Sequence, residues 1–117
     1  MENRSILVDV RLASNVTEND DSFDGQLIPL TNTYLFRVAQ IGIGKKGFYI
    51  TGTDEQWTDF IEENFEYFHP VKTYVGTKVR LDFDPPENAA LLTVLKEEVA
   101  QIEWCLYNEA EFGFPKE

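Results

Sequence analysis

The chain has 117 residues, 43% of them hydrophobic and 14% aromatic, which is enough for a single domain over residues 1–117 and excludes an intrinsically disordered protein. With 21 acidic and 10 basic residues it carries a net charge of -11, which opposes binding to nucleic acid or to an anionic membrane because their phosphates would be repelled. The same charge favours a basic protein as the partner.

The first part of the chain is predicted to form strands. Between residues 5 and 13, Ile6, Val8 and Val10 recur at every second position, the period of a strand with one buried face. Residues 14–25 are polar and acidic, and we expect a loop there. Further segments rich in branched or aromatic residues are also predicted strands, the last of them preceded by a glycine-flanked turn. These strands are 26–30, 33–43 and 48–51, and the turn is 44–47.

Residues 54–66, DEQWTDFIEENFE, are predicted to form an amphipathic helix whose outer side is acidic. The segment contains no basic residue, whereas surface helices usually mix charges of both signs. Thr53 and Gln56 have the spacing of a capping box at the start of this helix. We expect His69 and Pro70 to end it, because the residue before a proline avoids helical dihedral angles. The apolar residues at helical spacing are Trp57, Phe60, Ile61 and Phe65.

The chain continues with a predicted strand and a second predicted helix. Residues 71–83 alternate strictly, with valine, threonine, leucine or phenylalanine at every odd position. Two prolines, Pro85 and Pro86, then interrupt the chain before a helix over about 87–110. Its apolar stripe, widened by Trp104, consists of Leu91, Leu95, Val99, Ile102 and Leu106.

Together these segments indicate an α+β fold. Successive strands joined by short connections favour antiparallel pairing. We therefore expect a mostly antiparallel sheet of about five strands, with two amphipathic helices packed on one face.

No combination of residues indicates catalysis, a cofactor or a bound metal. The chain has one histidine, His69, and one cysteine, Cys105, and they lie far apart in sequence, which argues against a zinc site. Asp82 and Asp84 resemble a metal-binding DxD motif, but they are explained more simply as a polar end to the strand. Residues 42–47 lack the GxxxxGK[ST] pattern of a phosphate-binding loop. We therefore expect a protein without enzymatic activity.

The sequence also bears on the compartment. A single cysteine excludes an internal disulfide and fits a reducing environment. The first residues, MENRSILVDV, lack the apolar stretch of a signal peptide, and no segment approaches the roughly 20 apolar residues that span a bilayer. We expect a cytoplasmic protein.

In the absence of a catalytic set, the carboxylates become the candidate binding residues. Carboxylates beside aromatic rings can pair with Arg and Lys of a partner while the rings exclude water. The acidic helix and the acidic loop both offer this combination. The predicted partner-binding residues are Asp59, Glu62, Glu63, Glu66, Tyr67, Asp20, Asp21 and Asp24. A second copy of the chain is a further possible partner, because Lys72, Lys78 and Arg80 share one side of the strand predicted at 71–83.

The chain resembles the small acidic immunity proteins of bacterial toxin–immunity systems, including those of contact-dependent growth inhibition. The resemblance rests on its size, on the carboxylate helix DEQWTDFIEENFEYF, on the acidic loop TENDDSFD and on the missing catalytic set. It implies a cytoplasmic inhibitor that binds a basic, nuclease-like toxin domain and occludes the active site of that toxin.

Two other functions fit the same residues. One is a phage-type inhibitor that mimics DNA phosphates against a restriction or CRISPR effector, which the bases at positions 72, 78 and 80 argue against. The other is an enzyme or small-molecule-binding domain with a pocket between the sheet and the helices.

Overall fold

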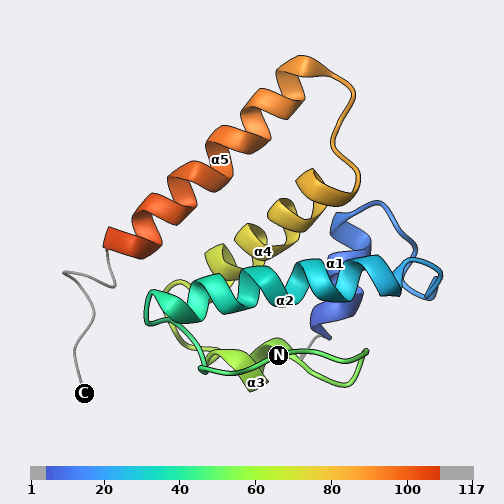
Figure 1. Cartoon of the computed structure of the whole chain (residues 1–117). Helices are drawn as coiled ribbons and strands as arrows, with labels where there is room; N and C mark the ends of the chain where they lie inside the picture. The colour runs from blue at the N-terminus through green and yellow to red at the C-terminus, as the bar shows by residue number, and fades with distance from the viewer. Residues whose placement is uncertain (1–4, 109–117) are drawn as a thin grey trace.

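The computed structural model describes residues 5–108, and within this range every regular element is an α-helix (Figure 1). The helices are α1 (Ile6–Ala13), α2 (Asp24–Gln40), α3 (Trp57–Phe60), α4 (Phe68–Phe83) and α5 (Ala89–Asn108). Residues 5–108 contain no β-strand, and the one β-type contact in this range is an isolated antiparallel bridge between Ser5 and Gln56. The predicted α+β fold is therefore wrong.

Four of the five predicted strands lie within helices, and the fifth is irregular. The segment 5–13 is α1, the segments 26–30 and 33–43 fall mainly in α2, and 71–83 falls in α4. Residues 48–51 follow the predicted turn at 44–47 as an irregular segment.

The prediction failed in α4 because its apolar residues satisfy two periods at once. Val71, Val75 and Val79 are four residues apart, so they belong both to an every-second-residue series and to one side of a helix. Burial separates the two possibilities: Tyr74 and Gly76, which lie on the opposite face of the predicted strand, are buried together with the valines. On a helix with about 3.6 residues per turn, Tyr74 lies within about 100° of Val71 and Val75, so it can be buried together with them.

Proline positions also differ from the prediction. Pro70 is the third residue of α4 rather than a helix terminator, and in the first turn of a helix its missing N–H breaks no helical hydrogen bond. Pro29 lies inside α2, where it removes the donor for the Gly25 carbonyl; Gly25 is on the exposed first turn, within reach of water.

The predicted acidic helix is reduced to the four residues of α3, and residues 61–67 form turns. The backbone N–H of Gln56 donates to the Asp59 carboxylate at 2.9 Å, so the cap begins three residues later than predicted. Helix α3 ends where the Phe60 carbonyl accepts a hydrogen bond from the Lys45 N–H at 2.9 Å instead of from the next turn. Gly44 permits this approach, since a Cβ there would lie 2.6 Å from the Phe60 ring.

The last helix and the acidic loop were predicted correctly. Helix α5 covers most of the predicted range 87–110, of which residues 109–110 lie outside the described part of the chain. The Asn88 side chain caps α5 by accepting the Leu91 N–H at 3.0 Å. The loop predicted at 14–25 extends over residues 14–23.

The core lies where α1, α2 and α4 meet. Helix α4 is central, because it contacts α1, α2 and α5, and Figure 1 shows it running antiparallel to α5. The largest fully buried side chains include Trp57, Tyr74, Leu7, Leu27 and Leu35. The indole N–H of Trp57 donates to Asp9 at 2.8 Å, which joins α3 to α1. We call α1, α2, α3 and α4 together the helical body.

Candidate protein-binding surfaces

Helix α5 exposes large apolar side chains to solvent. Only Val99 and Leu106 are buried among its 20 residues. Leu91 and Val94 are exposed near its start, and Trp104 and Tyr107, at 63% and 58% exposed, near its end. Exposed aromatic residues that gather in this way are typical of interaction sites.

The sequence assigned Trp104 to the buried stripe, and that assignment is wrong. Trp104 is two residues from the buried Leu106, which corresponds to a rotation of about 200° around a helix, so the two side chains point to opposite sides. This spacing was the signal that could have identified Trp104 as an outward-facing residue.

A groove of about 420 Å³ lies beside these exposed aromatics. We call it the α2–α5 groove. It is lined by Arg37, Val38, Ile41, Tyr74, Ala100, Glu103, Trp104, Leu106 and Tyr107. Arg37 and Glu103 face each other across it, with 3.6 Å between the guanidinium Nη1 and the carboxylate Oε2. The remaining lining is predominantly apolar, so the groove combines a hydrophobic surface with a few polar groups.

The Tyr74 hydroxyl is a buried polar group in this groove without a hydrogen bond of normal geometry. Burial, with a contribution from the Glu103 charge, raises the pKa of Tyr74 to about 12, so the hydroxyl keeps its proton near neutral pH. A buried hydroxyl left unsatisfied costs about 1–3 kcal/mol. Tyr74 therefore offers a donor that an occupant of the groove can satisfy.

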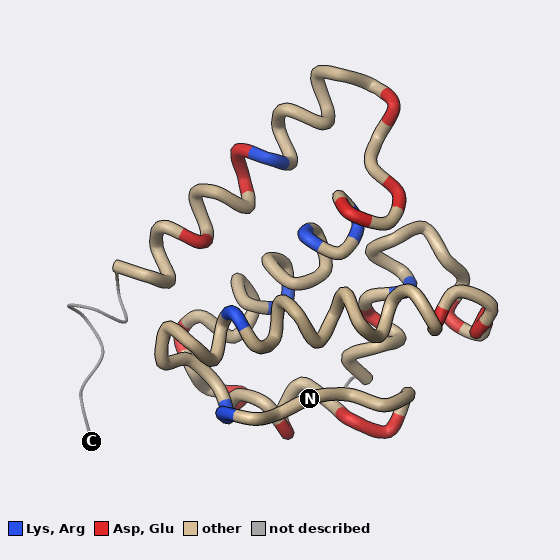
Figure 2. The backbone as a smooth tube through the Cα atoms, in the orientation of Figure 1, with Lys and Arg blue, Asp and Glu red and all other residues tan. Residues whose placement is uncertain are grey.

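A second, shallower hollow lies on the outer side of α5 and shares Ala100 and Trp104 with the groove. Its other lining residues are Glu97 and Gln101. Helix α5 carries the carboxylates of Glu97, Glu98 and Glu103 and the single base Lys96. Figure 2 shows acidic and basic positions along the helix. Trp104 is thus bordered by the apolar groove and by an acidic helix surface.

Two of the four acids predicted to bind a partner from the helix 54–66 line a different pocket. Asp59 and Glu62 line a pocket of about 680 Å³ together with Lys45, so positive charge lies beside this acidic segment. Glu63 and Glu66 are exposed in the turns between α3 and α4. Tyr67 immediately precedes α4 and is half-buried, with its ring centroid 6.0 Å from that of Phe65. Their role in partner binding stays a prediction.

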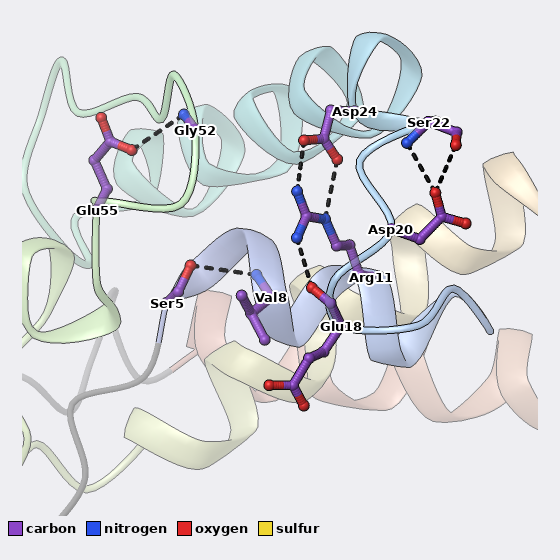
Figure 3. Close-up of polar contacts among 9 residues, drawn as sticks. All are labelled: Ser5, Val8, Arg11, Glu18, Asp20, Ser22, Asp24, Gly52 and Glu55. Carbon is purple, nitrogen blue, oxygen red and sulfur yellow. Dashed lines mark hydrogen bonds and ion pairs between the residues drawn. The ribbon is translucent and has the colours of Figure 1, made fainter.

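The loop acids make contacts within the chain (Figure 3). The buried Arg11 guanidinium binds the Asp24 carboxylate in a bidentate pair, with Nε–Oδ1 and Nη2–Oδ2 distances of 3.0 and 2.6 Å. Arg11 also donates to the Glu18 carbonyl at 2.6 Å, and its pKa is raised chiefly by the hydrogen bond to Asp24. Asp20 accepts two hydrogen bonds from Ser22, which lower its pKa. Asp24 and Asp20 therefore shape the loop, Asp21 is exposed, and binding of a partner by these three acids stays a prediction.

Two further features are absent from residues 5–108. No helix in this range is both long and apolar enough to cross a membrane. In the same range, His, Cys, Asp and Glu side chains form no group of three or more that could hold a metal ion.

Residues 6–112 match the sequence model of a family described as phage connector protein, a range that includes all the helices named above. No curated protein and no solved structure matches the chain.

This match overturns the resemblance to toxin-immunity proteins and the function drawn from it, the neutralisation of a toxin domain. The resemblance rested on size, the helix 54–66, the acidic loop and the missing catalytic set, and the structure reduces that helix to α3. Neither the DNA-mimicking inhibitor nor the small-molecule-binding domain is supported by the family. The family is consistent with a protein as the partner, but it does not support a toxin as that partner.

Proposed function

Because the chain belongs to the phage connector protein family, we propose that it is a structural component of a phage particle. Its proposed activity is to join head and tail by binding other phage proteins, without catalysing a reaction. The main structural observation in support of this proposal is the exposed apolar surface of α5, which identifies particular residues as candidates for binding.

The exposed aromatics of α5 are suited to protein binding. Tryptophan and tyrosine each bury about 150–250 Å² when they are covered, and they are enriched among the residues that dominate binding energy. Trp104 and Tyr107 lie one helical turn apart beside the α2–α5 groove. A partner that covers both would remove a large apolar area from water and would gain affinity at about 25 cal/mol per Å² before the costs of association.

The environments of the single histidine and cysteine support a role without catalysis. His69 is exposed in the first turn of α4, with its ring against Phe68 at 5.3 Å between centroids. Cys105 is half-buried in α5, where its sulfur accepts from the Gln101 side chain at 3.8 Å. An activated thiol needs a neighbouring base or positive charge, and these contacts supply neither.

A phage whose gene for this protein carries a nonsense mutation tests the proposal. In a host that cannot suppress the mutation, we expect heads and tails to accumulate separately under the electron microscope. In the wild type, mass spectrometry of purified particles should detect the protein. Joined particles at normal yield without the protein, or purified particles that lack it, would refute the proposed function.

Point variants connect the proposal to α5. The double variant Trp104→Ala, Tyr107→Ala should fold but fail to complement the mutant phage. Tyr49→Ala is the matched control, because Tyr49 is as exposed as Trp104, at 63%, and lies outside α5.

A further inference from the structure

We propose that the α2–α5 groove is the docking site for a basic amphipathic segment of another phage protein. This inference rests on the proposed function. The segment would insert an apolar side chain beside Trp104 and would place a lysine or arginine next to Glu97.

The lining of the groove selects an apolar anchor. Val38 and Ile41 form one wall at the end of α2, and Ala100 and Leu106 belong to the α5 side. Ala100 is the smallest of these side chains, and it opens both the groove and the neighbouring hollow. An aliphatic or aromatic side chain of a partner can fill this space as anchors do in known helix-binding grooves.

The Tyr74 hydroxyl adds a polar requirement. It is buried, lines the groove and has no hydrogen bond of normal geometry within the described chain. A carbonyl or side-chain oxygen of the inserted segment can accept its proton. The groove therefore recognises an apolar anchor that brings an acceptor with it.

Charge separates the possible occupants. Glu97 lines the hollow on the far side of Trp104, and Glu98 and Glu103 lie on the same helix. A second copy of this chain brings the same carboxylates and a net charge of -11, so repulsion opposes a contact between the α5 surfaces of two copies. A segment with lysine or arginine is attracted instead, and the pairing with Glu97 fixes its register.

Site-specific photocrosslinking inside the particle tests the proposal. The photoreactive residue p-benzoylphenylalanine is placed at position 104 in one phage and at position 49, equally exposed at 63%, in the control. After irradiation of purified particles, mass spectrometry identifies the crosslinked peptide. We expect position 104 to crosslink to a segment of a different phage protein in which an apolar residue is flanked by lysine or arginine.

Other outcomes overturn the proposal. These are a crosslink from position 104 to a second copy of the chain, a crosslink to an acidic segment, or a yield at position 104 no higher than at position 49. They leave the proposed function intact, provided that the protein is present in particles and is required for them to form. Its absence from particles refutes the proposed function itself.

Synthetic peptides then test the groove chemistry. The probe is a helical peptide with a central tryptophan flanked by lysines, and its twin has glutamates in place of the lysines. We expect the basic peptide to bind about tenfold more tightly than the twin. Ala100→Phe, which fills the groove, should weaken binding of the basic peptide about tenfold or more.

Tyr74→Phe provides a variant that leaves the shape of the groove unchanged. It should lower the affinity of the basic peptide about threefold to tenfold without lowering the melting temperature, because the hydroxyl makes no hydrogen bond of normal geometry in the free protein. Equal affinity of the two peptides, or unchanged affinity in Ala100→Phe, would contradict the proposed site.

Discussion

Helices α4 and α5 run side by side, yet they bury very different shares of their apolar residues. Helix α4, with 16 residues, buries Phe68, Val71, Tyr74, Val75 and Val79, whereas α5, with 20 residues, buries only Val99 and Leu106. Both sequences are rich in apolar residues, so composition does not explain the difference. The difference in burial is explained by the number of neighbouring helices, because α4 contacts α1, α2 and α5, while α5 packs mainly against α4.

This comparison indicates what the apolar residues of α5 are for. A side chain that is already exposed in the folded chain adds little to the folding free energy, because its exposure to water changes little on folding. Trp104 and Tyr107 are more than half exposed, so their size and apolar character are better explained by binding than by folding. We therefore expect the helical body to carry most of the stability and α5 to present the binding surface.

The largest expected effect separates the two helices directly. Val75→Asp would bury a carboxylate at a fully buried position of α4, and we expect a loss of about 4 kcal/mol or more in the free energy of unfolding. Val94→Asp in α5, where the side chain is 55% exposed, should change it by less than about 0.5 kcal/mol. Urea unfolding followed by circular dichroism measures both. Similar losses in the two variants would abolish the distinction between the helical body and α5.

A second prediction concerns an acid of the helical body that the sequence assigned to partner binding. Asp24→Ala would leave the buried Arg11 guanidinium without its carboxylate, and we expect a destabilisation of about 3 kcal/mol. Asp21→Ala, in the same loop but exposed, is the control and should be nearly neutral. If both variants unfold at the same urea concentration as the wild type, the Arg11–Asp24 pair does not hold the loop.

The third prediction is a dependence on alkaline pH. Burial is the main cause that raises the pKa values of Tyr34 and Tyr74 to about 12, and Tyr34 also donates to Asp82. Between about pH 10 and pH 12 the unfolded chain releases these protons while the folded chain retains them, so stability should fall as the pH rises. Unfolding in urea at several pH values tests this, and Tyr34→Phe should reduce the slope. A stability that stays constant over this range would contradict the burial of the two phenols.

The smallest effect is expected at the contact between α5 and α2. Arg37 and Glu103 are about half exposed, so their ion pair should contribute about 0–1 kcal/mol. Glu103→Gln should therefore change the urea midpoint only slightly, and added salt should remove even this difference. A loss as large as that in Asp24→Ala would show that α5 belongs to the stabilising core.

The sequence allowed correct prediction of α5 and of the acidic loop. The α5 stripe recurs at spacings of three and four residues, which no strand would give, and prolines precede the helix. In α4 the valines at 71, 75 and 79 fit both a strand and a helix, and the β-branched composition favoured the strand. The helix formed because it buries Tyr74 together with the valines against α1 and α2, a tertiary effect that local propensity does not contain.

The candidate binding surface was only partly predictable. The position of Trp104 opposite Leu106 could have been derived from helical geometry, but the α2–α5 groove depends on how two helices distant in sequence pack together. No short sequence motif, such as a metal-ligand spacing or a glycine-rich loop, identified the family. Membership required comparison of residues 6–112 as a whole.

Hydroxyl-radical footprinting tests the central claim most directly. The protein is oxidised once alone and once within purified phage particles, and labelling is measured by mass spectrometry at Trp104 and at Tyr49, which are both 63% exposed in the structure. We predict that incorporation into the particle strongly reduces labelling of Trp104 relative to Tyr49. Equal labelling of Trp104 in the free and the assembled protein would contradict the assignment of α5 as the binding surface.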